Sequence, residues 1–330
     1  MENVILEVID LNIEFHDHII PETVVYDFDL TLREGEIVGL VGESGSGKSM
    51  SALAIAGLLS RKDMKKRGRI LYRGTDLLTC PRRDLRAIQG NDISMIFQEP
   101  LTSLNPVKRI YDQVEEPLRI HTDLNKNERY EKVLNILKEV ELRDPELVMR
   151  QYPHELSGGM RQRVMIASAM IMEPKILIAD EPTTALDVTI QAQILDLLRQ
   201  LKSRINSSIM FITHDLGVIA EMADYVVVMY AGRIVEKGTA DDIFHHPAHP
   251  YTIGLMASKP VVGKKIDKLY SIPGKVPNPI NMPNYCYFKD RCEMCLARCD
   301  HDYPQEVSLS PTHKVSCYRY YDQEGNHEQD

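Results

Sequence analysis

One stretch of eight residues, GESGSGKS at 42–49, constrains the fold of this chain more than any other feature. It matches the pattern G-x-x-x-x-G-K-[ST] and stands between an apolar segment, EIVGLV, and a run with helical character, KSMSALAIAGLL. A strand that turns through glycines into the start of a helix points backbone N–H groups at a phosphate. The stretch therefore predicts a phosphate-binding loop in an α/β fold of the P-loop NTPase type.

The residue types in this loop suit a nucleoside triphosphate bound with magnesium. Gly45 and Gly47 allow the backbone to wrap around the phosphates. Lys48 is expected to reach the β- and γ-phosphates, and Ser49 to supply a hydroxyl to Mg²⁺. The loop residues expected to contact the nucleotide are Gly42, Ser44, Gly45, Ser46, Gly47, Lys48, Ser49 and Met50.

A second apolar strand, KILIADE at 175–181, ends in two carboxylates. A buried parallel strand would deliver Asp180 beside the phosphate-binding loop, where it can hold magnesium directly or through water. Glu181 would then be placed to polarise an attacking water as a general base. In one chain, the loop and this strand together predict nucleotide hydrolysis.

The other apolar patterns predict strands alternating with helices. DISMIF, SIMFITHD and YVVVMYAGRIVEKG read as strands, and such alternation indicates a mostly parallel sheet with helices on its faces. Residues 100–172 are helical in character; for example, YEKVLNILKEVEL places Val133, Leu137 and Val140 on one stripe. We expect this stretch to be a helical subdomain inserted into the sheet domain.

Charge argues against a nucleic-acid partner. The formal net charge is −9, so the overall field does not attract nucleic acid or an anionic membrane surface. One basic run, RKDMKKRGR at 61–69, could be read as a nucleic-acid contact, but an ordinary solvated loop is the favoured interpretation.

The chain is expected to be cytoplasmic. No apolar run approaches the roughly 18 residues that span a bilayer. The start, MENVILEVID, has no basic region followed by an apolar one, as a secretory signal would. Any role at a membrane must therefore depend on partners.

Five of the six cysteines lie between 286 and 317. Their spacing is C-x5-C-x2-C-x3-C-x17-C, using Cys286, Cys292, Cys295, Cys299 and Cys317. In a reducing cytosol such crowding favours a metal site over disulfides. Cys80 lies far from these in sequence and is assigned no role.

In order and spacing, GESGSGKS, LSGGM and ILIADEP resemble the ATP-binding subunit of an ABC transporter, and the resemblance covers essentially the whole chain. It implies that Gln98, in IFQEP, is the Q-loop residue and that His214, in ITHD, is the switch histidine. With Glu181 they form the implied catalytic set. The implied magnesium ligands are Ser49, Gln98 and Asp180, Phe15 is the implied adenine-stacking residue, and Asp187 in TTALD is the implied D-loop residue.

The same resemblance explains the serine- and glycine-rich turn in ELSGGMRQR. Members of this family pair head to tail, and each signature motif closes on the partner's ATP. Here that motif is Ser157, Gly158, Gly159 and Met160. A helix that starts at such a turn offers free N–H groups and the positive end of its dipole to a γ-phosphate.

Several phrases resemble the D-type subunit of the peptide and nickel importers, among them FQEPLTSLNP and HPAHPYTIGLMASKP. Met160 stands where most of the wider family has glutamine, which is typical of the D-type. The resemblance implies a heterodimer with a companion F-type ATPase, two transmembrane permease subunits, an external substrate-binding protein and a place on the cytoplasmic face of the cell membrane. Peptide is the favoured cargo and nickel or another metal chelate the alternative; an ABC-type ATPase acting on DNA or ribosomes is the rival from another class.

In this branch a C-terminal extension can hold a [4Fe–4S] cluster, which implies Cys286, Cys292, Cys299 and Cys317 as ligands and leaves Cys295 as an extra cysteine. Four thiolates also suit tetrahedral zinc, and unligated thiols are the third possibility. We therefore expect an ATPase domain at 1–258, with its helical subdomain at about 100–172, and an extension at 259–330 that carries the cysteines.

Overall fold

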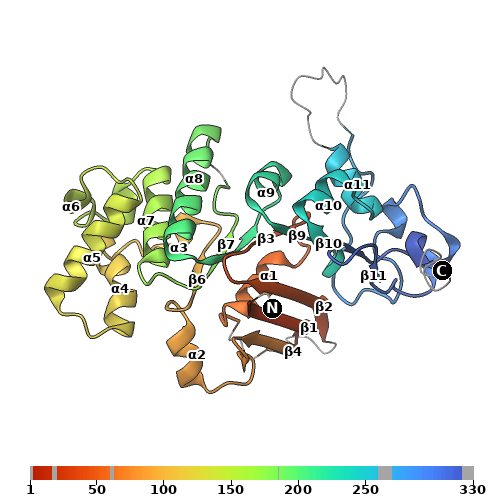
Figure 1. The fold of residues 1–330 in the computed structure, drawn as a ribbon, viewed down its shortest axis with the longest axis horizontal. Helices are drawn as coiled ribbons and strands as arrows, with labels where there is room; N and C mark the ends of the chain where they lie inside the picture. Colours follow the sequence, from red (N-terminus) through yellow and green to blue (C-terminus); the bar gives the residue numbers. More distant parts are fainter. Residues whose placement is uncertain (1–2, 17–20, 60–62, 185, 259–269, 322–330) are drawn as a thin grey trace.

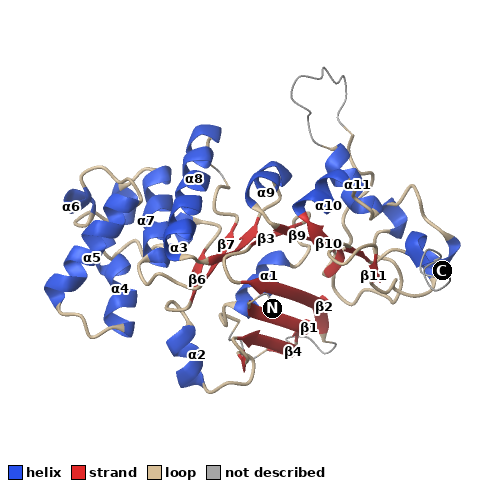
Figure 2. Cartoon of the chain, in the orientation of Figure 1, coloured by secondary structure: helices blue, strands red, loops and turns tan. Residues whose placement is uncertain are grey.

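The computed structural model describes residues 3–16, 21–59, 63–184, 186–258 and 270–321. Its strands form two sheets, one of eight strands and one of four (Figure 1). A group of helices extends from one end of the larger sheet, and the C-terminal segment, residues 270–321, covers the other end (Figure 2).

The larger sheet has the strand order β11-β12-β10-β9-β3-β8-β7-β6. Its five parallel strands are β3 (Ile37–Val41), β6 (Ile93–Ile96), β7 (Ile176–Asp180), β8 (Ser208–Ile212) and β9 (Tyr225–Tyr230). Every residue of β3, β7 and β8 is buried, which is why these segments are continuous apolar runs. The expected parallel sheet is confirmed for this central part.

The helices α1 (Lys48–Ile55), α8 (Val188–Ile205) and α9 (Leu216–Met222) follow strands of this sheet. The carboxyl ends of β3 and β7 lie at one edge of the sheet, separated by β8. The phosphate-binding loop after β3 and the carboxylates at the end of β7 are therefore neighbours, although more than a hundred residues separate them in sequence.

The four-stranded sheet is antiparallel, with the order β2-β1-β4-β5. Its strands are β1 (Val4–Phe15), β2 (Glu22–Arg33), β4 (Met64–Tyr72) and β5 (Thr75–Asp76). The interpretation of 61–69 as a solvated loop was wrong from Met64 onward, because this segment pairs with β1, Lys65 opposite Glu14. β5 covers only the end of β4, so the basic residues lie along a largely free edge, where charge is common.

The stretch predicted to be helical contains α3 (Pro100–Ser103), α4 (Ile110–His121), α5 (Lys126–Glu139), α6 (Pro145–Val148) and α7 (Gly158–Met170). They gather at the left of Figure 1, beside β6 and β7. The predicted stripe of Val133, Leu137 and Val140 is fully buried among them. Another helix, α2 (Arg82–Ile88), lies below the sheet in this view.

The C-terminal third begins with β10 (Arg233–Thr239), which forms a hairpin with β9, and continues through α10 (Ala240–His245) and α11 (Pro250–Ala257). The irregular segment that follows contains single 3₁₀ turns at Lys289–Arg291 and Ala297–Asp300. Two short strands, β11 (Val307–Ser308) and β12 (Lys314–Val315), then pair with each other and, through β12, with β10. The cysteine-bearing segment is thus joined to the main sheet.

Among the described residues, no helix combines the length and the apolar character that crossing a membrane would need.

Candidate active site

The phosphate-binding loop joins β3 to α1 as predicted, and its glycines have backbone angles that other residues rarely adopt. Gly47, which precedes α1, has φ 95°. A side chain at Gly42 would meet the carbonyl oxygen of Met229 at 2.2 Å. The close approach of the loop to β9 therefore requires glycine at this position.

Lys48 is buried at the start of α1, and its Nζ donates hydrogen bonds to the carbonyl oxygens of Gly42 and Glu43, at 2.8 and 3.0 Å. Burial lowers the pKa of Lys48, an effect that Glu181, Asp180 and Glu43 oppose. The ammonium group thus lies within the curl of the loop, where a phosphate would replace the backbone carbonyls as its partner.

A cavity of about 340 Å³ lies directly over the loop. The residues that line it are Phe15, Val24, Ser44, Gly45, Ser46, Gly47, Lys48, Ser49, Met50, Gln98, Glu181 and Pro279. All of these except Val24 and Pro279 belong to the set that the sequence predicted. Phe15 lies at the end of β1, so the aromatic ring and the phosphate loop border the same cavity.

Asp180 ends β7 and accepts a hydrogen bond from the Ser49 hydroxyl, 3.1 Å from Oγ to Oδ1. Only 5% of Asp180 is exposed, and this burial raises the pKa of its carboxyl group. A hydroxyl and a carboxylate at this separation suit Mg²⁺, which takes few protein ligands and completes its shell with phosphate and water oxygens. These two residues fit the magnesium site that the sequence predicted.

Glu181 is held by three side chains from separate segments. Its carboxylate accepts hydrogen bonds from Gln98 Nε2 at 3.0 Å and Thr184 Oγ1 at 2.8 Å, and its other oxygen lies 3.2 Å from His214 Nδ1. Burial alone would raise the pKa of Glu181, but the bonds from Thr184 and His214 outweigh it and leave the pKa below its usual value. The group is therefore ionised at neutral pH, as a general base must be.

The backbone of Glu181 has φ 46°, an uncommon value for a residue with a side chain. Strained residues persist where the surrounding structure holds them, often at functional sites. Here the Glu181 N–H donates to the carbonyl of Ile212, at the end of β8. The turn fixes the carboxylate above the sheet edge, beside the cavity.

The serine- and glycine-rich turn at 157–160 does not border the cavity over the phosphate loop. Ser157 caps α7, where its Oγ accepts a hydrogen bond from the Met160 N–H at 3.3 Å. Ser157 and Gly158 are exposed, and none of the four predicted signature residues lines the cavity over the phosphate loop. Asp187, predicted to be the D-loop residue, is exposed and caps α8 through the Ile190 N–H.

Four of the five clustered cysteines border one small cavity, of about 10 Å³: Cys286, Cys292, Cys299 and Cys317. Cys295 is exposed and does not line it. Burial raises the pKa of Cys286 to about 12 and that of Cys317 to about 11. Within the described part of the chain, however, no group of three or more Cys, His, Asp or Glu side chains is placed so that it could hold a metal ion.

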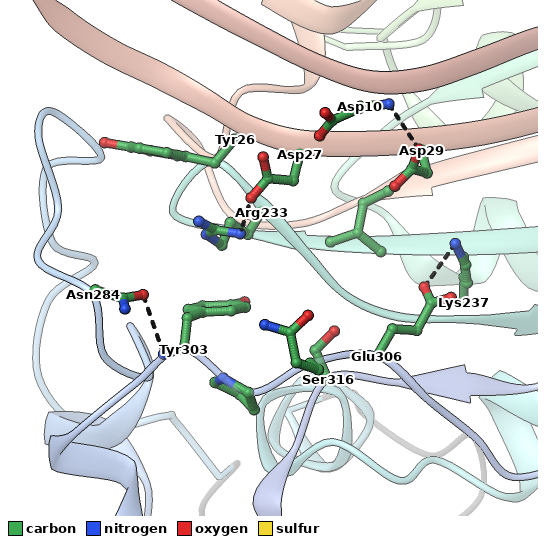
Figure 3. A pocket seen from close by; sticks show the side chains of 13 residues that line it. Asp10, Tyr26, Asp27, Asp29, Arg233, Lys237, Asn284, Tyr303, Glu306 and Ser316 are labelled. Atoms are coloured by element: carbon green, nitrogen blue, oxygen red, sulfur yellow. Dashed lines mark hydrogen bonds and ion pairs between the residues drawn. The ribbon is translucent and has the colours of Figure 1, made fainter. Parts of the chain in front are cut away.

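Another cavity, of about 430 Å³, lies between β2, β10 and the C-terminal segment (Figure 3). None of the predicted site residues lines it. Arg233 donates a hydrogen bond to Asp27 at 2.6 Å, and its guanidinium lies 4.2 Å from the centre of the Tyr303 ring. On the far side of the cavity Lys237 pairs with Glu306 at 2.7 Å. The contacts of Arg233 with Tyr303 and of Lys237 with Glu306 join β10 to the C-terminal segment.

The sequence interpretation missed four residues around the site: Val24, Thr184, Pro279 and Arg291, the last of which bonds Glu43 of the phosphate loop. Thr184 follows Glu181 by three residues, and on a tight turn this spacing could have predicted that the two side chains meet. Pro279 and Arg291 lie more than two hundred residues from the loop, and no local pattern connects them to it.

Two family models match the chain. One, described as ABC transporter, matches residues 25–184. The other, described as oligopeptide/dipeptide transporter, C-terminal region, matches residues 235–299. The first range contains the phosphate loop and the turn at 157–160, and the second contains three of the four cysteines at the small cavity.

Curated relatives match over nearly their whole length. The oligopeptide transport ATP-binding protein OppD of Salmonella typhimurium is 46% identical, over 96% of this chain and 94% of that protein. The oligopeptide transport ATP-binding protein AppD of Bacillus subtilis is 47% identical, over 96% of this chain and 97% of that protein. The dipeptide transport ATP-binding protein DppD of Lactococcus lactis is 45% identical, over 94% of this chain and 90% of that protein.

Solved structures share the fold over about seven tenths of the chain. A dimeric post-hydrolysis state of the ATP-binding cassette MJ0796 with ADP and Pi has a TM-score of 0.64 and 26% identity, over 71% of this chain and 98% of that one. The cbiO1 component of a Clostridium perfringens ABC transporter complex has a TM-score of 0.62 and 29% identity, over 74% of this chain and 92% of that one.

Proposed function

The chain belongs to the family of ABC transporter ATP-binding proteins, and from this premise we propose that it hydrolyses ATP to drive peptide import. The observation that carries the proposal is the geometry around Glu181, whose carboxylate is held by Gln98, Thr184 and His214 beside the phosphate-binding loop. The curated relatives named for oligopeptide and dipeptide transport support the cargo.

In the proposed reaction, a water attacks the γ-phosphorus of ATP and the bond to the β-phosphate oxygen breaks, giving ADP and phosphate. Glu181 orients this water and takes its proton, while His214 holds the carboxylate. Lys48 and the loop N–H groups offset the charge of the β- and γ-phosphates. When bound, Mg²⁺ neutralises phosphate charge, and Ser49, Asp180 and Gln98 are the residues that would hold it.

The signature residues Ser157, Gly158, Gly159 and Met160 bind the ATP of a second ATPase subunit in this proposal. The exposure of Ser157 and Gly158, and the absence of all four residues from the cavity over their own phosphate loop, support binding in trans. Asp187, which is exposed and caps α8, would border the same interface. The partner that we propose is the companion F-type ATPase, which makes the closed form a heterodimer.

Two permease subunits and an external substrate-binding protein complete the proposed importer, with this chain on the cytoplasmic face of the membrane. The permeases would dock on the helical insertion and the segment around Gln98. A cavity of about 240 Å³ supports this position, because it lies between α1, β6 and α7 and is largely apolar. Leu58 and Phe97, which line it, are exposed large hydrophobic residues.

We divide the chain into an ATPase domain at 1–258, with a helical subdomain at about 100–172, and an extension at 259–330. In the extension, Cys286, Cys292, Cys299 and Cys317 are the proposed ligands of a [4Fe–4S] cluster or, alternatively, zinc. Their position around one cavity supports the donor set. Such a group would stabilise a segment that has little regular structure of its own.

Elemental analysis tests the metal. Protein purified without oxygen should contain iron and sulfide, or zinc, in proportion to the chain, and Cys299→Ser should lose most of it. Cys295→Ser is the matched control, since Cys295 lies outside the cavity, and it should retain the metal. Metal-free wild-type protein would contradict this part of the proposal.

The cargo is tested in the complete transporter. We expect peptides, delivered by the external binding protein, to stimulate ATP hydrolysis by the subunits reconstituted in vesicles. Stimulation by nickel chelates and not by peptides would assign the chain to a metal importer instead. Salt-sensitive DNA binding by the purified chain would favour a nucleic-acid ATPase.

A further inference from the structure

A residue of the C-terminal segment reaches the phosphate-binding loop. Arg291 donates hydrogen bonds from Nη1 and Nη2 to the two carboxylate oxygens of Glu43, at 2.7 and 3.2 Å. Glu43 is the second residue of GESGSGKS, and 248 positions separate it from Arg291. Two parallel hydrogen bonds between a guanidinium and a carboxylate pair the two charges and also fix the orientation of both groups.

Arg291 is held in place independently of this contact. Only 7% of Arg291 is exposed, and its Nε donates a hydrogen bond to the carbonyl oxygen of Pro273 at 2.8 Å. The guanidinium also lies 5.7 Å from the ring centre of Tyr230 and 5.9 Å from that of Phe288. A cation fixed by packing can order a neighbouring loop at little entropic cost, because its own freedom is already lost.

A second group holds Glu43 through its backbone. The Glu43 N–H donates to the hydroxyl of Tyr251, on α11, at 2.8 Å. Tyr251 is fully buried and packs against Tyr230 and Phe288, the two rings that flank Arg291. One aromatic cluster therefore supports both contacts to the phosphate loop.

Charge makes the contact relevant to ATP. Glu43 is an acidic residue in a loop that must bind the negatively charged phosphates of ATP. Its backbone carbonyl accepts a hydrogen bond from Lys48 Nζ, the group that we propose binds the phosphates. Without Arg291 the Glu43 carboxylate would repel the phosphates and attract Lys48. The ion pair offsets that charge in a partly buried site, where screening by water is weak.

The C-terminal segment also reaches the opposite end of the ATP cavity. Pro279 lines the cavity near Phe15, and its carbonyl oxygen accepts from the Tyr26 hydroxyl at 2.7 Å. Asn281 follows and accepts from the Thr23 N–H on β2 at 3.1 Å. The segment is thus attached at both the adenine end and the phosphate end of one site.

We propose that Arg291 is a positioning residue for ATP, which neutralises Glu43 and keeps the phosphate-binding loop and Lys48 available to the nucleotide. ATP binding by this chain then depends on the C-terminal segment being folded against the ATPase domain. The inference rests on the proposed function, since it assumes that ATP occupies the cavity over the loop.

Binding of a nonhydrolysable ATP analogue with magnesium tests this in the full-length chain. We expect Arg291→Gln to weaken binding about tenfold, within the range of coupling between two sites in one protein. Glu43→Gln alone completes the double-mutant cycle and should weaken binding less than Arg291→Gln, because it leaves no carboxylate beside the phosphates. The double variant should regain most of the lost affinity, since it no longer contains the charge that Arg291 offsets.

Two further variants control for folding. Glu306→Gln removes the ion pair with Lys237, another contact between the C-terminal segment and the ATPase domain, and should leave binding within about twofold. Arg291→Lys keeps the charge and should bind more tightly than Arg291→Gln. Thermal unfolding without nucleotide identifies any variant whose fold is disturbed. If Arg291→Gln is such a variant, Arg291→Lys takes its place: it should bind more weakly than wild type, because an ammonium group cannot form both bonds to Glu43, and wild-type affinity would overturn the inference.

Wild-type affinity in Arg291→Gln would overturn the inference. So would a double variant as weak as Arg291→Gln, because Arg291 would then act on the fold of the segment and not through Glu43. If the wild-type chain itself does not bind the analogue, the ATP site of the proposed function is wrong and this inference falls with it.

Discussion

At the scale of single residues, the environment of Glu181 decides the chemistry. Two carboxylates follow each other at the end of β7, yet burial raises the pKa of Asp180 while hydrogen bonds lower that of Glu181. Asp180 faces Ser49, and Glu181 faces His214, Gln98 and Thr184. These different surroundings support the two roles that we propose, a metal ligand for Asp180 and a base for Glu181.

The first prediction follows from this separation. Glu181→Gln should lower kcat for ATP hydrolysis by about 10²- to 10⁴-fold, because an amide cannot accept the proton of the attacking water. Binding of ATP should remain near that of wild type, since glutamine has the same shape and can still bond Thr184 and Gln98. Steady-state hydrolysis and analogue binding measure the two effects separately.

Asp196→Asn is the matched control for this change. It removes one carboxylate charge from an exposed ion pair with Arg199 on α8, away from the ATP cavity, and should leave kcat unchanged. If Glu181→Gln hydrolyses ATP as fast as this control, another group must act as the base.

At the scale of elements, α11 connects the C-terminal third to the phosphate loop, and its first turn depends on a neutral histidine. His249 caps the helix, with Nδ1 accepting from the Tyr251 N–H at 3.0 Å. Burial lowers the pKa of His249 to about 4, although the buried carboxylate of Glu236, which also faces His313, opposes the shift. A protonated ring could not accept this hydrogen bond.

The second prediction concerns pH. The unfolded histidine has a pKa near 6.5, so between about pH 6.5 and pH 4 the unfolded chain binds a proton that the folded chain does not. The free energy of unfolding should therefore fall as the pH falls through this window. From the two pKa values, the contribution of His249 is on the order of 3 kcal/mol.

Urea unfolding at a series of pH values measures this effect. His249→Asn keeps a capping side chain without a titrating ring, so its unfolding free energy should decline less steeply over the same window. His245→Asn, which changes an exposed histidine on α10, should follow the wild-type profile. Parallel profiles for His249→Asn and wild type would show that the buried ring contributes nothing.

At the scale of the whole molecule, this chain has one half of each proposed ATP site. The phosphate loop lies between β3 and α1, whereas the signature residues begin α7 on the helical arm (Figure 1). The two sets do not border the same cavity, which agrees with our proposal that a second subunit closes each site.

The third prediction tests which subunit that is. Light scattering of Glu181→Gln protein with ATP and magnesium should show dimer when the companion F-type subunit is added and monomer when it is absent, because hydrolysis no longer opens the interface. Adding Ser157→Arg should abolish the dimer without weakening ATP binding, since Ser157 is exposed and lies outside the ATP cavity of its own chain. Equal dimerisation of the chain alone would argue for a homodimer, like the dimeric cassette MJ0796.

Sequence by itself determined the features whose causes are local. The phosphate loop, the strand that carries Asp180 and Glu181, and the stripe of α5 each depend on contiguous residues or on a fixed periodicity. Family resemblance added Gln98 and His214, which the structure places within hydrogen-bonding distance of Glu181. The sequence interpretation was wrong at β4, because this edge strand carries the run of basic residues that usually indicates a solvated loop.

Only the tertiary structure decided how the C-terminal segment meets the ATP site. Arg291 and Pro279 reach residues far away in the sequence, and such contacts depend on how an irregular segment packs, for which no periodicity exists. For the cysteines, the family resemblance implied a set of four with Cys295 as an extra one, and folding places those four around one cavity and leaves Cys295 outside it. A local motif is enough to predict which residues bind phosphate, whereas only the packing of the whole chain decides which distant residues contact that motif.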